Sequence, residues 1–127
     1  MTGKSIAQRV QETKGRIENL SPDQLEQELS VGNATLVDVR DAAELAGGSI
    51  AGAVHASRGM LEFHADPASP YHKSELRPGD RVILYCASGG RSALAVESLR
   101  ELGYVNVAHL DGGFKVWQAA GKPVHKA

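Results

Sequence analysis

Short apolar runs alternate with helix-forming segments along most of the chain, and this alternation limits the folds that the sequence can adopt. Runs rich in β-branched residues predict strands at residues 17–20, 34–39, 82–85 and 105–109, with a brief one within 50–55. Periodic or capped segments predict helices at residues 5–16, 22–30, 41–46, 60–63, 92–102 and 111–120. Because parallel strands need crossover helices, the sequence predicts an α/β fold: a central, mainly parallel five-stranded sheet with helices on both faces.

Several helix ends are marked by their capping residues. Ser21, followed by Pro22 and Gln24, predicts a helix start with a capping box. Asp111 is expected to cap the last helix. Ser92 either caps the helix that it begins or donates its hydroxyl to the loop before it or to a substrate.

The size and charge of the chain bound its organisation. Its 127 residues fit one domain, which we place at residues 15–127, after an N-terminal helical extension at residues 1–14. The formal net charge is -1, from 14 basic and 15 acidic residues, so no basic field gathers nucleic acid. No apolar segment approaches the roughly 20 residues that span a bilayer. One cysteine and a start unlike a signal peptide predict a cytoplasmic protein with no membrane or nucleic-acid partner.

Cys86 is that one cysteine, and its position points to chemistry. It follows the strand-forming run 81–85 and precedes a glycine-containing turn that leads into a helix. The N–H groups and the dipole of a helix start favour a thiolate over a thiol. Asp38 and Arg40 end another predicted strand, and ligands bind where the carboxyl ends of parallel strands meet. We therefore expect an active site at that edge, with Cys86 as the nucleophile.

Four separated motifs, in order and in spacing, resemble the rhodanese domain over roughly residues 15 to 123. They are Leu36-Val37-Asp38-Val39-Arg40 with the later Glu44, Gly48-Ser49-Ile50-Ala51-Gly52-Ala53, Cys86-Ala87-Ser88-Gly89-Gly90-Arg91-Ser92, and Leu110-Asp111-Gly112-Gly113-Phe114-Lys115-Val116-Trp117. Ser49 departs from the family, which usually has histidine there, in a motif that serves the fold. The chain resembles the single-domain sulfurtransferases of the thiosulfate sulfurtransferase type.

The resemblance implies a double displacement without a cofactor. Cys86 would attack the sulfane sulfur of a donor such as thiosulfate, release sulfite and hold the sulfur as a persulfide until cyanide or a thiol removes it. The residues themselves favour the same step, because N–H groups can cradle a thiolate or a persulfide along the loop Ala87, Ser88, Gly89, Gly90, Arg91 and Ser92. The expected partners are small sulfur donors and acceptors, and a protein that carries a persulfide.

The length of the loop separates sulfur transfer from a related chemistry. Four residues lie between Cys86 and Arg91. Related phosphatases and arsenate reductases of this fold have five, which gives a wider pocket for a tetrahedral oxyanion. No general-acid carboxylate is evident in the immediate sequence of the loop. We expect sulfur transfer, and phosphatase or arsenate reductase activity is the less favoured alternative.

Charged residues around the loop have supporting roles. Arg91 is expected to brace the loop against Glu44 or Asp38. Asp38 and Arg40 are expected to fix the geometry of strand and loop by ion pairing.

Two cations, Arg58 and Lys115, lie on segments that could border the pocket and attract an anionic donor.

The five histidines show no metal-ligand spacing, so we predict no metal site. His109 is the one candidate for a Cys-His dyad, which a dipole-stabilised thiolate does not need.

A non-enzymatic role is the competing class. Domains of this family also occur as regulatory or persulfide-relay modules that bind a partner. An inactive module would be expected to lose the cysteine, whereas a relay would keep it. The sequence therefore leaves relay and independent turnover open.

Overall fold

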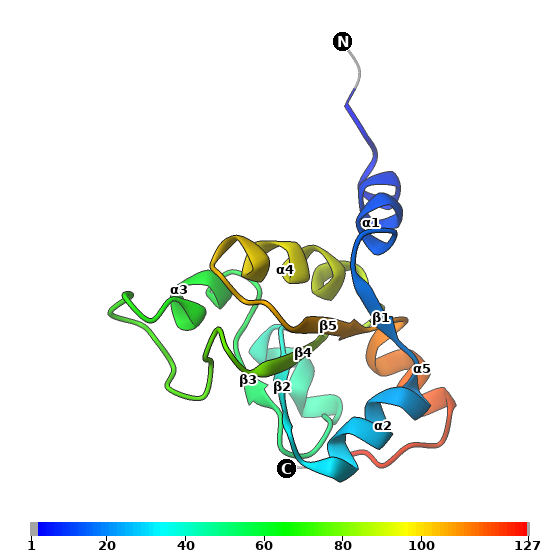
Figure 1. Ribbon diagram of the computed structural model, residues 1–127. Coiled ribbons are helices and arrows are strands. Elements are labelled where there is room, and N and C mark those ends of the chain that lie inside the picture. Colours follow the sequence, from blue (N-terminus) through cyan, green and yellow to red (C-terminus); the bar gives the residue numbers. More distant parts are fainter. Residues whose placement is uncertain (1–2, 127) are drawn as a thin grey trace.

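In the computed structural model, which describes residues 3–126, five strands form one sheet (Figure 1). The strands are β1 (Glu18–Leu20), β2 (Ala34–Asp38), β3 (Val54–His55), β4 (Arg81–Tyr85) and β5 (Val107–Leu110). They lie in the order β1-β5-β4-β2-β3, and every pairing is parallel. The predicted α/β architecture is confirmed, and the carboxyl ends of the strands share one edge of the sheet.

The other elements of residues 3–126 are helices: α1 (Ile6–Lys14), α2 (Pro22–Val31), the 3-10 helix η1 (Ala42–Gly47), α3 (Leu61–Ala65), α4 (Gly90–Glu101) and α5 (Gly113–Ala119). The capping box predicted at α2 is present. The Ser21 hydroxyl accepts from the Gln24 N–H, and the Gln24 side chain accepts from the Ser21 N–H. Within the described residues, no helix is both long and apolar enough to cross a membrane.

Helices cover both faces of the sheet, and successive side chains of β4 pack on opposite faces. Val82 and Leu84 belong to a core that α3 and α4 close. Ile83 and Tyr85 belong to a second core that α2 and α5 close. Figure 1 shows α4 on one side of the sheet and α5 on the other. β4 is therefore buried on both sides, and it holds the following residue, Cys86, at the centre of the carboxyl edge.

The start of α4 differs from the sequence prediction. The helix begins at Gly90, with Gly89 as its N-cap in the left-handed conformation (φ 98°). Ser92 is therefore the third residue of the helix, and the prediction that it caps the helix was wrong. Because glycine has no side chain to accept a hydrogen bond, the first N–H groups of α4 need another acceptor.

The segment before α5 also differs from the prediction. α5 begins at Gly113 after a left-handed Gly112, so Asp111 precedes the N-cap and is not itself the cap. The Asp111 carboxylate instead pairs with Lys14 of α1 at 2.7 Å. β5 begins at Val107 rather than Val105, because the Val105 side chain is 82% exposed and takes no part in the sheet.

A buried ion pair closes the end of β2. Arg40 and Asp38 are 3% and 1% exposed, and Arg40 Nη2 lies 2.8 Å from Asp38 Oδ2. Arg40 Nη2 also donates to the Gly48 carbonyl at 2.9 Å. The guanidinium carbon lies 4.6 Å from the centroid of the Phe114 ring. The pair thus joins β2 to the segment after η1 and to α5.

Asp38→Asn should lower the free energy of unfolding by about 3 kcal/mol, because it leaves the Arg40 charge buried without its carboxylate. Urea denaturation of the variant and the wild type measures this difference. Glu101→Gln, which changes an exposed carboxylate at the end of α4, is the control and should shift stability by less than about 0.5 kcal/mol. An Asp38→Asn curve that overlays the wild type would contradict the role of the pair.

Candidate active site

Cys86 directly follows β4, and its side chain is 1% exposed. Its sulfur accepts two backbone hydrogen bonds, from the Gly89 N–H at 3.1 Å and from the Ser92 N–H at 3.4 Å. Because Ser92 lies in the first turn of α4, the sulfur occupies the place of the missing capping side chain. The N–H groups and the helix dipole both stabilise negative charge at this sulfur.

The predicted loop residues 87–92 form one turn around this sulfur. Ser88 is exposed, Gly89 and Ser92 are buried, and the others are half-buried. Four more backbone N–H groups of the loop have no hydrogen-bond acceptor within residues 3–126; they belong to Ala87, Ser88, Gly90 and Arg91. Consecutive N–H groups of this kind can bind an anion.

The N-terminus of α5 holds the same loop through its carbonyl groups. The Phe114 N–H donates to the Cys86 carbonyl at 2.8 Å, and the Lys115 N–H donates to the Ala87 carbonyl at 3.0 Å. A Cβ atom at Gly113 would lie 2.6 Å from the Cys86 carbonyl oxygen, so this approach requires glycine. No role for the N-terminus of α5 was predicted from the sequence. The Gly-Gly pair before this helix was the signal that could have revealed it.

Arg91 braces the loop against Glu44 of η1. The two residues form a bidentate pair, with Nη1 to Oε1 at 2.7 Å and Nη2 to Oε2 at 3.0 Å. The hydrogen bonds from Arg91 lower the pKa of Glu44 to about 2. Of the two partners expected for Arg91, the structure brings Glu44 to it, because Asp38 is occupied by Arg40. Both terminal nitrogens of Arg91 are therefore committed to a carboxylate.

The two cations expected near the pocket differ in their partners. Arg58 Nη1 donates to Glu62 of α3 at 2.8 Å, so its charge is paired. Lys115 is exposed and forms no ion pair with any other described residue. Its own backbone N–H is bonded to the loop carbonyl of Ala87. Of these two cations, Lys115 is thus the one without an ion pair in residues 3–126 and with its backbone bonded to the loop.

His109 is fully buried and lies behind Ser92 rather than against Cys86. Its Nδ1 is 2.8 Å from Ser92 Oγ, which in turn is 3.5 Å from Cys86 Sγ. Within residues 3–126 no hydrogen bond joins His109 to Cys86 directly. Burial lowers the pKa of His109 to about 4, so the imidazole is neutral at neutral pH. The direct Cys-His dyad considered from the sequence is therefore not formed.

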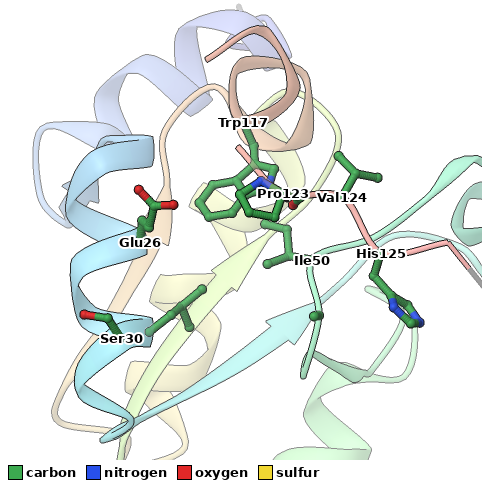
Figure 2. Close-up of a pocket in the computed structure, with 9 residues that line it drawn as sticks. Glu26, Ser30, Ile50, Trp117, Pro123, Val124 and His125 are labelled. Atoms are coloured by element: carbon green, nitrogen blue, oxygen red, sulfur yellow. Dashed lines mark hydrogen bonds between the residues drawn. The ribbon is translucent and has the colours of Figure 1, made fainter. Parts of the chain in front are cut away.

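An apolar groove of about 490 Å³ lies between α2 and the C-terminal segment (Figure 2). Its lining includes Leu29, Ile50, Trp117 and Val124, with Glu26 at its border on α2. No residue of the loop 86–92 lines it. The groove is therefore separate from the cysteine site.

Most of this chain is similar in sequence to proteins of one known family. The model of the rhodanese-like domain matches residues 21–120. A sulfurtransferase of Allochromatium vinosum is 36% identical over 85% of this chain and 94% of its own length. The thiosulfate sulfurtransferase GlpE of Ectopseudomonas mendocina is 35% identical over 79% of this chain and 84% of its own length. This chain spans only 55% of the length of an uncharacterized protein of Synechocystis. That match covers 84% of this chain at 33% identity.

A solved structure from Rhodopseudomonas palustris is also similar to this chain. That protein is described as one of unknown function and a possible tyrosine phosphatase. Its TM-score is 0.89 at 35% identity, and the match covers 98% of this chain and 97% of that one.

Glu44→Gln should lower the free energy of unfolding by about 1 kcal/mol at pH 7, a modest value because both partners are about one-third exposed and solvent screens the pair. The folded-state pKa of Glu44 is about 2, below the usual 4.5, so the pair stabilises the protein above pH 4.5. Its contribution is lost as the pH falls from 4.5 towards 2. Urea denaturation at several pH values should show the difference between wild type and variant shrinking over this range. A difference that does not change with pH would refute the ion-pair account.

Proposed function

Because the chain belongs to the rhodanese-like sulfurtransferase family, we propose that it moves a sulfane sulfur from thiosulfate or a similar donor to a thiophilic acceptor through a persulfide on Cys86. The thiolate attacks the outer sulfur of thiosulfate, and the S–S bond of the donor breaks with its electron pair leaving on sulfite. Cys86 then carries the sulfur as a persulfide anion. A thiol or cyanide takes this sulfur and restores the thiolate.

The observation that carries the proposal is the pair of N–H groups bonded to the Cys86 sulfur, from Gly89 and Ser92. A sulfur held by such donors is favoured as an anion and can act as a nucleophile. The loop N–H groups without acceptors supply donors for the outer, charged sulfur of the persulfide. One loop thus supports both the resting and the loaded state.

Thiosulfate is the donor we favour, on two grounds. A relative that this chain resembles over most of its length is the thiosulfate sulfurtransferase GlpE. Lys115, on a segment bonded to the loop, is exposed and has no ion-pair partner among the described residues, so it can attract a dianionic donor. Persulfide relay to or from a protein partner is the second candidate, favoured by the 1% exposure of Cys86, which suits a donor that reaches into the loop.

A phosphatase role is weaker, although the similar Rhodopseudomonas palustris protein is described as a possible tyrosine phosphatase. Arg91, the cation of the loop, is paired with Glu44 through both terminal nitrogens. A phosphoryl dianion needs such a guanidinium for itself. The four-residue spacing from Cys86 to Arg91 also favours a sulfur-sized pocket.

We also propose that residues 15–127 form the transferase domain and that residues 1–14 are a helical extension to it. A reducing compartment, the cytoplasm, suits a reactive cysteine that has no disulfide partner in the chain.

Incubation with thiosulfate should add the mass of one sulfur atom to the wild-type chain, because Cys86 keeps the sulfane sulfur. Intact-mass spectrometry checks this, and Cys86→Ser is the matched control that should stay unmodified. Addition of cyanide should remove the adduct and produce thiocyanate. A wild type without an adduct, or an adduct that persists in Cys86→Ser, would exclude Cys86 as the sulfur carrier. Release of nitrophenol from para-nitrophenyl phosphate that depends on Cys86 would favour phosphatase activity instead.

Lys115→Gln should lower kcat/KM for thiosulfate by about two- to fivefold at low salt, since it removes an exposed cation that attracts the dianion. Arg58→Gln is the paired comparison and should have a smaller effect, because Glu62 already neutralises Arg58. Steady-state rates at low and high ionic strength separate attraction from folding defects, because salt should erase the Lys115→Gln effect. Equal losses in both variants at every salt concentration would argue against the Lys115 role.

A further inference from the structure

A chain of hydrogen bonds, buried except at its half-buried Asn19 end, runs from Asn19 on β1 through His109 on β5 to Ser92 on α4 and ends at Cys86. Asn19 Oδ1 lies 2.7 Å from His109 Nε2, and His109 Nδ1 lies 2.8 Å from Ser92 Oγ. Ser92 Oγ lies 3.5 Å from Cys86 Sγ. His109 and Ser92 are both 0% exposed. The sulfur-transfer steps above use neither side chain, so this chain of bonds has no role so far.

Asn19 determines which atoms donate and which accept in this series of hydrogen bonds. Its Nδ2 donates to two carbonyl groups, those of Lys14 at 2.9 Å and Ile17 at 3.1 Å. The amide oxygen therefore faces His109 Nε2, and an oxygen can only accept there. Nε2 must carry the hydrogen, which leaves Nδ1 of the neutral imidazole as an acceptor.

The charged groups around His109 leave the imidazole neutral. Burial is the largest influence, and it lowers the pKa of His109 to about 4. Asp111 on the segment after β5 favours the charged form and Lys14 of α1 opposes it, and these two residues form an ion pair with each other. Ser92 and Asn19, the hydrogen-bond partners of the ring, are uncharged. The Nε2–H tautomer is therefore the form that meets Ser92 at neutral pH.

The Ser92 hydroxyl has one proton to donate, and besides the Cys86 sulfur at 3.5 Å two acceptors among the described residues compete for it. His109 Nδ1 lies at 2.8 Å, whereas the Gly89 carbonyl lies at 3.4 Å. The shorter bond takes the proton. The lone pairs of Ser92 Oγ are then left to face the Cys86 sulfur.

We propose that His109 is a positioning residue for the reaction: through Ser92, it turns a hydroxyl lone pair towards the Cys86 sulfur. This lone pair can accept from the thiol form, and it withholds an O–H donor from the thiolate. In the loaded state, which rests on the proposed function, the charge lies on the outer sulfur and Sγ is neutral. The lone pair then opposes no charge on Sγ. His109 therefore biases the site away from the bare thiolate and towards the persulfide.

A titration of thiolate absorbance on the full chain tests this, because Cys86 is the only cysteine and Cys86→Ser supplies the blank. His109→Gln can keep a side-chain bond to Asn19 but places no acceptor at the Nδ1 position. Ser92 is then released to donate to the anionic sulfur, which is a better acceptor than the Gly89 carbonyl. The midpoint of the titration should fall by about one pH unit, the size of one hydrogen bond to a charged group.

Two matched variants show whether the effect passes through Ser92. His109→Asn puts an amide oxygen near the Nδ1 position, so its midpoint should stay near that of the wild type. In a Ser92→Ala background, His109→Gln should cause no further shift, because no hydroxyl remains to be turned. A shift of the same size in both backgrounds would mean that His109 acts by packing alone, and would overturn the proposal.

Two further results would also overturn it. A midpoint that rises in His109→Gln would mean that His109 draws the thiol proton through Ser92 rather than holding the hydroxyl away. ¹⁵N NMR of the wild type at neutral pH should find the hydrogen on Nε2 of His109. An Nδ1–H tautomer would mean that His109 donates to Ser92, which contradicts the proposed hydrogen-bond directions without the use of any variant. Neither measurement involves sulfur transfer, so a failed thiosulfate adduct would leave this test intact.

Discussion

The N-terminus of α4 begins without a capping side chain, and the Cys86 sulfur accepts the Ser92 N–H bond that a cap would take, together with the Gly89 N–H. A serine or aspartate at position 89 would supply a competing oxygen for the Ser92 N–H. Gly89 gives the left-handed turn and brings no competitor. The bond from the Ser92 N–H thus caps the helix and stabilises charge on the sulfur at the same time. The strand places the sulfur, and the helix start supplies its partners.

The hydrogen bonds to the Cys86 sulfur require that the loop peptide groups direct their N–H groups towards it. The α5 N-terminus binds the Cys86 and Ala87 carbonyls, which fixes the orientation of the two peptide groups at the start of the loop. The close approach depends on Gly113, since a Cβ there would meet both of these residues at 2.6 to 2.7 Å. Glu44 holds the far end of the loop through Arg91. Two elements distant in sequence therefore orient one short turn.

Much of this fold could be predicted from the sequence, because its strongest signals are local. The capping box at Ser21 and the apolar run of β4 depend on neighbouring residues, and both were predicted correctly. The start of α4 was placed two residues late because a Gly-Gly pair resembles a loop, whereas Gly89 is the left-handed N-cap and Gly90 is the first helical residue. The expected cap at Asp111 was wrong because Gly112 is the N-cap, and the Asp111 carboxylate pairs with Lys14 of α1. Both helix errors lie at a Gly-Gly pair whose first glycine is a left-handed N-cap.

The candidate site also has features that could be predicted from the sequence and features that could not. The position of Cys86 and the identity of its loop follow from contiguous residues, as does the separation from Arg91. The chain from Asn19 to His109 could not be predicted, because it depends on β1 lying beside β5, although the two strands are far apart in the sequence. Periodicity shows that a strand is buried, but not which strand lies next to it. Strand order is what brings these two side chains together.

The charges around the loop also limit which anion the site can bind. Arg91 directs both terminal nitrogens to Glu44, so the loop faces a bound anion with backbone N–H groups rather than with a guanidinium. Backbone dipoles stabilise a single, diffuse charge such as that on a persulfide sulfur, whereas a phosphoryl dianion in a buried site calls for a full countercharge. Releasing Arg91 for that purpose would leave Glu44 without its partner and the loop without its brace. The ion pair that orders the loop is therefore also a reason that the site suits sulfur.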